Sequence, residues 1–209
     1  MSVLVEGKAG KARIIFAHGA GMDMQNPYMD ALTVRISGPD IQVVRFNFPY
    51  MEQRRVTGKK RPPDRMPVLL EAYRKIIDSY EDDVPLFLMG KSMGGRVATL
   101  LLEETRAKAA FVVGYPFHPI GNNQNLRIDH LAAIVKPLSI FQGTRDKLGN
   151  LDEVQTYHLP SNVKLHWFED GDHDLKPRKV SGHTQEEYLD TVARSVLVSI
   201  EEAVNVPTR

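Results

Sequence analysis

The feature that most constrains the fold is a Gly-x-Ser-x-Gly pentapeptide, Gly90 to Gly94, which stands between two different hydrophobic patterns. The residues before it, 84–89, form an apolar run with the length of a strand buried on both faces. The residues after it, 96–106, place apolar side chains at helical spacing. A strand that passes directly into a helix puts Ser92 at the tip of a tight bend, and flanking glycines let the two backbones pass closely. The pentapeptide also occurs by chance in ordinary turns, but this setting favours Ser92 as a nucleophile.

Strand patterns and helix patterns alternate along the rest of the chain. Strands that alternate with helices predict an α/β fold, with a mostly parallel, doubly wound sheet and helices on both faces. The segment 50–64 is polar and basic without a clear period. The expected strands are 12–17, 41–48, 84–89, 109–115, 138–142 and 163–168, and the expected helices are 26–37, 67–80, 96–106 and 184–203.

The length, net charge and residue composition of the chain exclude several classes of function. A chain of 209 residues predicts a single domain, 1–209, and a net charge of +1 gives no general attraction to nucleic acid or to membranes. The absence of cysteine excludes a disulfide, a thiolate nucleophile and a cysteine-based zinc site. The sequence shows no secretion signal and no apolar segment of roughly 20 residues, so we expect a cytoplasmic protein. Nothing in the sequence indicates the oligomeric state.

A serine hydroxyl needs a base to take its proton and a carboxylate to orient that base. Loops at the carboxyl ends of parallel strands converge on one edge of the sheet, so we expect the base and the carboxylate in those loops. Asp146 follows the strand 138–142, and His173 follows the strand 163–168. His173 is the one histidine after Asp146 that comes directly after a strand, and the others are His158, His166 and His183. A turn aspartate and a solvated loop histidine are the alternative interpretations, and Asp172 and Asp174 are competing carboxylates that lie too close in sequence to orient His173.

The oxyanion formed by nucleophilic attack requires N–H donors. One donor is expected to be the backbone N–H of Met93, directly after Ser92. The other is expected from the loop after the first strand, where we expect the N–H of Ala20 to donate. That loop, His18 to Gly21, could also be a simple glycine turn. His18 is a further candidate for substrate contact. No metal and no cofactor is needed for this chemistry.

These residues together resemble the alpha/beta-hydrolase superfamily over nearly the whole chain. The loop His18 to Gly21 is similar to the oxyanion loop of that superfamily, Gly90 to Gly94 to its nucleophile elbow, and Gly143 to Asp146 to its acid loop. Asp172-His173 is similar to its histidine loop. Together with residues 45–50, these segments resemble a small branch without a cap, related to dienelactone hydrolases and to the testis-expressed protein 30 group. Dienelactone hydrolases use a cysteine nucleophile, whereas this chain has Ser92, so that specific reaction is not implied.

We expect a serine hydrolase that cleaves an ester, thioester or related acyl bond of a small-molecule substrate through an acyl-enzyme, with Ser92, His173 and Asp146 as its triad. The sequence does not choose among carboxylesters, thioesters, lactones and peptides. The interval 116–136 is too short for a helical lid, so we expect an open site, and Tyr115 is a candidate for its lining. The segment 54–65 holds six Arg and Lys residues. It is interpreted either as a solvated loop or as a site where Arg54 and Arg55 capture an anionic group. The alternative function is a non-catalytic binding or scaffold protein that uses this basic loop, and nucleic-acid binding is a weaker option because the loop lacks interleaved aromatic residues.

Overall fold

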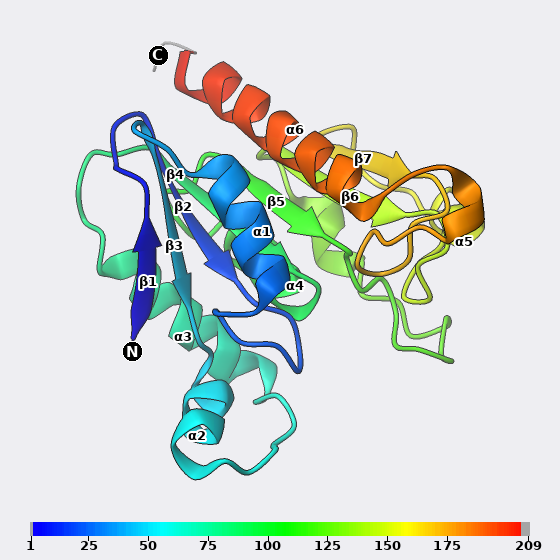
Figure 1. Ribbon diagram of the computed structural model, residues 1–209, viewed down its shortest axis with the longest axis horizontal. Helices are drawn as coiled ribbons and strands as arrows, with labels where there is room; N and C mark the ends of the chain where they lie inside the picture. The colour runs from blue at the N-terminus through cyan, green and yellow to red at the C-terminus, as the bar shows by residue number, and fades with distance from the viewer. Residues whose placement is uncertain (1, 206–209) are drawn as a thin grey trace.

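The computed structural model describes residues 2–205, which fold around a seven-stranded sheet with the order β1-β3-β2-β4-β5-β6-β7. Only β1 runs antiparallel to its neighbour, and every other adjacent pair is parallel. Figure 1 shows the twisted sheet with helices on both sides, so the predicted α/β fold is confirmed. The strands are β1 (Val3–Glu6), β2 (Ala12–Ala17), β3 (Ile41–Phe46), β4 (Leu86–Lys91), β5 (Ala110–Val113), β6 (Leu138–Gly143) and β7 (Val163–Phe168).

The helices cover the two faces of the sheet in pairs. Helices α1 and α6 pack together on one face, and α3 and α4 pack on the other (Figure 1). Side chains alternate along the strands between these faces: Ile15 and Ala17 pack toward α3 and α4, whereas Ile14 and Phe16 pack toward α1 and α6. The α-helices are α1 (Pro27–Ile36), α2 (Pro49–Thr57), α3 (Met66–Asp78), α4 (Met93–Leu101), α5 (Leu151–Val154) and α6 (Gln185–Asn205), and the 3-10 helices are η1 (Asp129–Ala133) and η2 (Lys179–Ser181).

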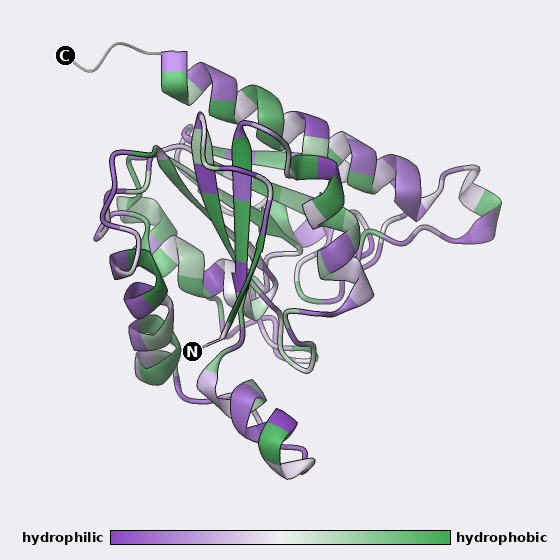
Figure 2. Ribbon diagram, turned by 60° about the vertical axis from the view of Figure 1, so that its left-hand side comes forward, coloured by the Kyte–Doolittle hydropathy of each residue, from purple (hydrophilic) through white to green (hydrophobic). Residues whose placement is uncertain are grey.

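The central strands are hydrophobic on both faces, as the apolar runs predict. Every residue of β2, β4, β5 and β6 is buried. Figure 2 shows the strands mainly in the hydrophobic colour, while the helices carry both colours on opposite sides. A parallel sheet covered on both faces requires this pattern.

Besides the short helices α5 and η2, the structure contains a strand and a longer helix that the sequence patterns did not indicate. Strand β1 has only four residues and pairs its Val3 with Phe46 of β3 at the sheet edge. Helix α2 lies where the chain showed no period, because only Tyr50 and Met51 of the helix are buried. Pro49, which directly follows the expected strand 41–48, occupies the first turn of α2, where its missing N–H costs nothing.

The segment between α4 and β6 is short, as expected from the interval 116–136. It contains β5, a long loop and η1, so no long cap covers the carboxyl edge of the sheet. The loops after β2, β4, β6 and β7 therefore meet at an open edge. Within residues 2–205, no helix is both long and apolar enough to cross a membrane.

Candidate active site

Ser92 occupies the bend between β4 and α4. Its φ of 51° lies in a region that residues other than glycine rarely adopt. The bend is tight because α4 lies directly against the strands: a Cβ on Gly90 would stand 2.2 Å from the Gly94 carbonyl carbon. A Cβ on Gly94 would stand 2.5 Å from the Ala17 oxygen. Glycine at both positions is thus a steric requirement of the elbow.

The structure brings Ser92, His173 and Asp146 into one chain of hydrogen bonds. His173 Nε2 lies 2.8 Å from Ser92 Oγ, and His173 Nδ1 lies 2.7 Å from Asp146 Oδ2. An ionised carboxylate can only accept, so Nδ1 carries the proton and Nε2 is free to accept from the serine hydroxyl. These are the contacts that the order of the loops predicted. Asp172 and Asp174 lie outside this chain of contacts, since Asp172 Oδ1 accepts from the backbone of Asp174 and Lys176.

Asp146 is fully buried and held at several points. Its Oδ2 also accepts from Gln142 Nε2 at 2.8 Å, and its Oδ1 accepts from the Leu148 N–H at 2.9 Å. Gln142 is itself fixed, because it exchanges two hydrogen bonds with the backbone of Tyr115. Gln142 belongs to strand β6, and its role could have been noticed from a polar side chain inside an apolar strand.

Lys91 is a second residue that the sequence interpretation missed. It directly precedes Ser92, and its side chain is 1% exposed. Its Nζ donates to the His173 carbonyl oxygen at 2.7 Å and pairs with Asp174 Oδ1 at 3.0 Å. Burial lowers the pKa of Lys91, and the negative charge of Asp174 opposes that shift. Lys91 thus ties the loop that carries His173 to the elbow.

The loop after β2 brings Ala20 beside Ser92, where both residues line the same hollow. Met93 is the first residue of α4, so its N–H has no acceptor within the helix. His18 lies behind the loop, fully buried, where Nε2 accepts the Phe48 N–H at 3.0 Å and Nδ1 contacts the Gly19 oxygen at 2.8 Å. Burial lowers the pKa of His18 to about 4, so the ring is neutral at pH 7. His18 shapes the loop from behind and does not line the hollow.

The hollow next to Ser92 has a volume of about 410 Å³, a size typical of small-molecule sites. Residues from five parts of the chain line it, and two of them are arginines that were not singled out from the sequence. The lining consists of Ala20, Pro63, Asp64, Met66, Leu69, Ser92, Met93, Arg96, Pro116, Arg127 and Leu148. A different hollow adjoins His173 and Asp146 and shares only Leu148 with the first.

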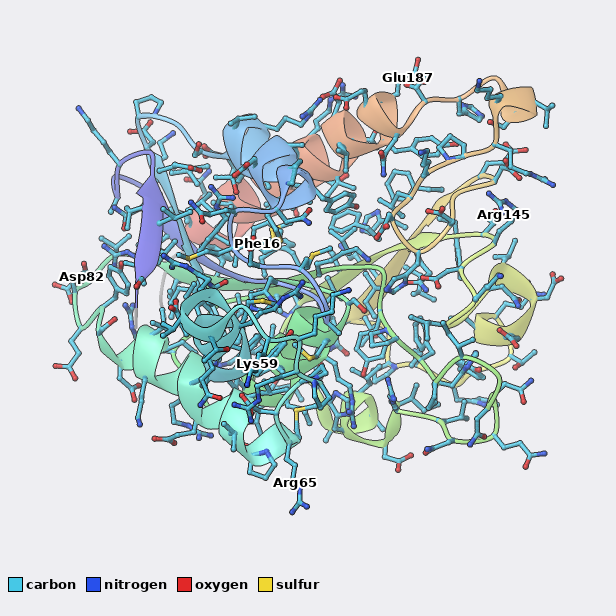
Figure 3. The ribbon with its side chains drawn as sticks, turned by 60° about the horizontal axis from the view of Figure 1, so that its bottom comes forward. Phe16, Lys59, Arg65, Asp82, Arg145 and Glu187 are labelled. Atoms are coloured by element: carbon cyan, nitrogen blue, oxygen red, sulfur yellow. The ribbon has the colours of Figure 1, made fainter. Side chains whose placement is uncertain are left out.

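The other candidate substrate contacts lie away from this hollow. Arg54 and Arg55 lie on α2 and line a separate depression with Gly21 and Met22. Arg65 ends the basic segment and projects from the start of α3 away from the molecule (Figure 3). Tyr115 is fully buried, and its hydroxyl donates to the Arg127 carbonyl oxygen at 2.7 Å. Among the described residues, no group of three or more His, Asp or Glu side chains has the arrangement of a metal site.

Comparisons with known proteins agree with this architecture. A family model described as "Alpha/beta hydrolase domain" matches residues 10–201. No curated protein sequence matches. Among solved structures, Est1E from Butyrivibrio proteoclasticus with bound ferulic acid superposes with a TM-score of 0.70 at 14% identity, over 96% of this chain and 95% of Est1E.

Two further solved structures share the fold at similarly low sequence identity. An alpha-beta serine hydrolase homologue from Coxiella burnetii has a TM-score of 0.68 at 17% identity, over 93% of this chain and 90% of that one. XC6422 from Xanthomonas campestris, described as an a/b serine hydrolase without lid, has a TM-score of 0.61 at 15% identity, over 99% and 90% of the two chains. At these identities, the likeness establishes the fold.

Proposed function

The chain belongs to the alpha/beta hydrolase domain family, and on that premise we propose that it is a serine hydrolase that cleaves an ester, thioester or related acyl bond. The observation that carries the proposal is the continuous hydrogen-bond chain from Ser92 through His173 to Asp146. Esterase-like structural neighbours are consistent with it. The substrate determines whether the protein acts as a carboxylesterase or as a thioesterase.

The reaction proceeds in two halves. Ser92 Oγ attacks the acyl carbon while its proton passes to His173 Nε2, and Asp146 stabilises the imidazolium that forms. The N–H groups of Ala20 and Met93 stabilise the oxyanion, each donor contributing a factor of roughly 10²–10³ in rate. His173 then protonates the leaving group, and the acyl group stays on Ser92. In the second half, His173 deprotonates a water molecule that releases the acid and restores the serine hydroxyl.

A fluorophosphonate probe tests the proposal directly. The nucleophile displaces the probe's fluoride, so we expect the intact mass of the protein to rise by one phosphonyl group. Ser92→Ala should abolish the adduct, whereas Ser161→Ala, an exposed turn serine, should leave it unchanged. An unchanged mass in the wild-type protein, or an adduct that survives Ser92→Ala, would contradict a Ser92 mechanism and favour a non-catalytic binding protein.

A further inference from the structure

Two arginine side chains in the Ser92 hollow have no acidic partner among the described residues. Arg96 lies one helical turn after the nucleophile on α4, and Arg127 lies on the loop before η1. Neither guanidinium has a carboxylate within 4.0 Å in residues 2–205, and Arg96 Nε is buried without a hydrogen-bond partner. The two most buried arginines of residues 2–205 do have acidic partners: Arg13 pairs with Asp82, and Arg45, whose Nε is also without a partner, pairs with Glu6 and Asp30 through its other nitrogens. An unpaired buried donor is costly, so its retention beside the nucleophile points to a ligand.

Three side chains close to Arg96, those of Tyr115, His130 and Arg127, carry no negative charge. Arg96 adjoins the Tyr115 hydroxyl, and burial together with the Arg96 charge lowers the pKa of His130 to about 4. The pKa of Arg127 is lowered by burial and by the charge of Arg96. The two guanidiniums therefore repel each other across the hollow, and an anion between them would relieve that repulsion.

One carboxylate lines the same hollow, and it offsets part of the positive charge of the two arginines. Asp64 belongs to the segment before α3, and its Oδ2 accepts the Tyr50 N–H at 2.8 Å. The formal charge of the lining is thus two positive groups against one negative group. A single carboxylate neutralises the remaining charge, whereas a phosphate dianion would exceed it. Guanidinium groups also bind carboxylates in a bidentate geometry.

The position of His173 decides which half of the substrate carries this carboxylate. The leaving group must lie within hydrogen-bond reach of His173 Nε2, because that atom protonates it. His173 lines the other hollow and not the one with the arginines. The arginine hollow instead contains Ser92, Ala20 and Met93, which surround the acyl carbon in the proposed mechanism. The acyl portion therefore extends toward Arg96 and Arg127.

We propose that the hollow beside Ser92 selects acyl groups that bear a carboxylate, such as the half-ester or half-thioester of a dicarboxylic acid, and that Arg96 and Arg127 bind this carboxylate. This inference rests on the proposed serine hydrolase function. Capture of an anion by Arg54 and Arg55 is a separate idea, because those residues line a different depression.

The test compares three aryl esters. The first is a mono-aryl adipate, whose acyl chain ends in a carboxylate and is too long to attack its own ester readily. The second is its methyl ester, which has nearly the same length without the charge. The third is an aryl acetate with the carboxylate on the leaving group. We expect the wild-type kcat/KM for the first ester to exceed that for the second by about tenfold or more, as a charge-assisted contact allows.

Substitutions assign the preference to the arginines. Arg96→Gln and Arg127→Gln should each lower kcat/KM for the acid-bearing acyl ester by about tenfold, mainly through KM, and change it less than about twofold for the methyl ester. Arg194→Gln, an exposed α6 residue, makes the same charge change outside the hollow and should change neither. Circular dichroism and the Tm of each variant show whether it is folded.

Three other outcomes of these measurements would overturn the inference. Equal kcat/KM values of the wild-type protein for the two adipates would show that the hollow does not select charge. An equal loss on both adipates in a folded Arg96→Gln variant would make the arginine structural. A loss confined to the third ester would place the anion on the leaving group. Fluorophosphonate labelling separates these failures from a failure of the proposed function, because it reports on Ser92 whatever the acyl preference.

Discussion

At the scale of single residues, the site depends on buried polar side chains whose partners are fixed. Asp146 has no exposed surface, and Gln142 and the Leu148 N–H hold its two oxygens. The carboxylate makes a further hydrogen bond with His173 Nδ1, so its orientation relative to the imidazole is fixed. Preorganisation of this kind matters because a catalytic group that must first find its orientation loses much of its rate advantage.

Lys91 is a positioning residue, and its substitution provides a test at this scale. Lys91→Met keeps the length of the buried side chain but leaves the His173 carbonyl without its donor. We expect a loss of about 1–3 kcal/mol in the free energy of unfolding, measured by urea denaturation, because a buried acceptor becomes unsatisfied. We also expect kcat to fall more than KM changes, since the His173 loop is less well placed.

Asp174→Asn is the matched control for Lys91→Met. It removes the ion pair with Lys91 but keeps the hydrogen bond from Lys91 to the His173 carbonyl. The hydrogen bond that places the His173 loop is kept, and Asp174 itself is 53% exposed, so kcat should stay near the wild-type value. Equal effects of the two substitutions on kcat would show that Lys91 acts through its charge and not through the His173 carbonyl.

At the scale of elements, the chain order of strands and loops was enough to predict which segments meet. The strand 163–168 was predicted with the bounds of β7, and the elbow was placed between a strand and a helix. The helix after it begins at Met93 and not at 96, because Gly94 and Gly95 hide the first turn from a hydrophobic pattern. Helix α2 could not be found by periodicity, since most of its side chains are exposed.

Contact between α4 and the sheet at Gly94 gives a test at the scale of elements. In Gly94→Ala, the new Cβ would stand 2.5 Å from the Ala17 oxygen and 2.6 Å from the His18 oxygen, and both are backbone atoms that cannot move freely. The helix must therefore shift away from β2, which displaces the Met93 N–H and Ser92. We expect a loss of about 1–3 kcal/mol in the free energy of unfolding and a lower rate of fluorophosphonate labelling.

Gly38→Ala is the control for Gly94→Ala, because a Cβ at Gly38 meets nothing within 4 Å. Its stability and labelling rate should match those of the wild-type protein. If Gly94→Ala matched them too, the close approach of α4 to the loop after β2 would not be what positions the elbow.

At the scale of the whole molecule, the sequence could predict which loops share an edge but not which side chains face the hollow. Ser92, His173 and Asp146 each follow a strand, so topology alone predicts that they come together. Neither arginine stands in the loop that directly follows a strand at this edge: Arg96 lies on a face of α4, and Arg127 lies on the irregular loop before η1. Their meeting depends on how that loop folds back over α4, which no local pattern encodes.

The loops after β6 and β7 are joined by Asp170, and this link makes the stability of the molecule depend on pH. Asp170 Oδ1 pairs with Arg145 Nε at 2.8 Å, and its two oxygens accept from Arg178. Arg145 comes from the loop after β6 and is labelled in Figure 3. Hydrogen bonds from Arg178 are the main cause that lowers the pKa of Asp170 from 3.8 to about 2.

Asp170→Asn tests this link across the molecule. As the pH falls from 3.8 to about 2, the unfolded chain binds a proton at Asp170 before the folded chain does, so the stability contributed by the carboxylate is present above pH 3.8 and lost through this window. The variant lacks that contribution at every pH, while asparagine still accepts the positive φ of 52°. We therefore expect the urea midpoint of the wild-type protein to exceed that of Asp170→Asn by a constant amount above pH 4 and by a shrinking amount below it.

Asp83→Asn, an exposed turn substitution, should follow the wild-type curve throughout. Parallel curves for wild-type and Asp170→Asn down to pH 2 would mean that the Arg145 and Arg178 contacts do not couple the two loops through this charge.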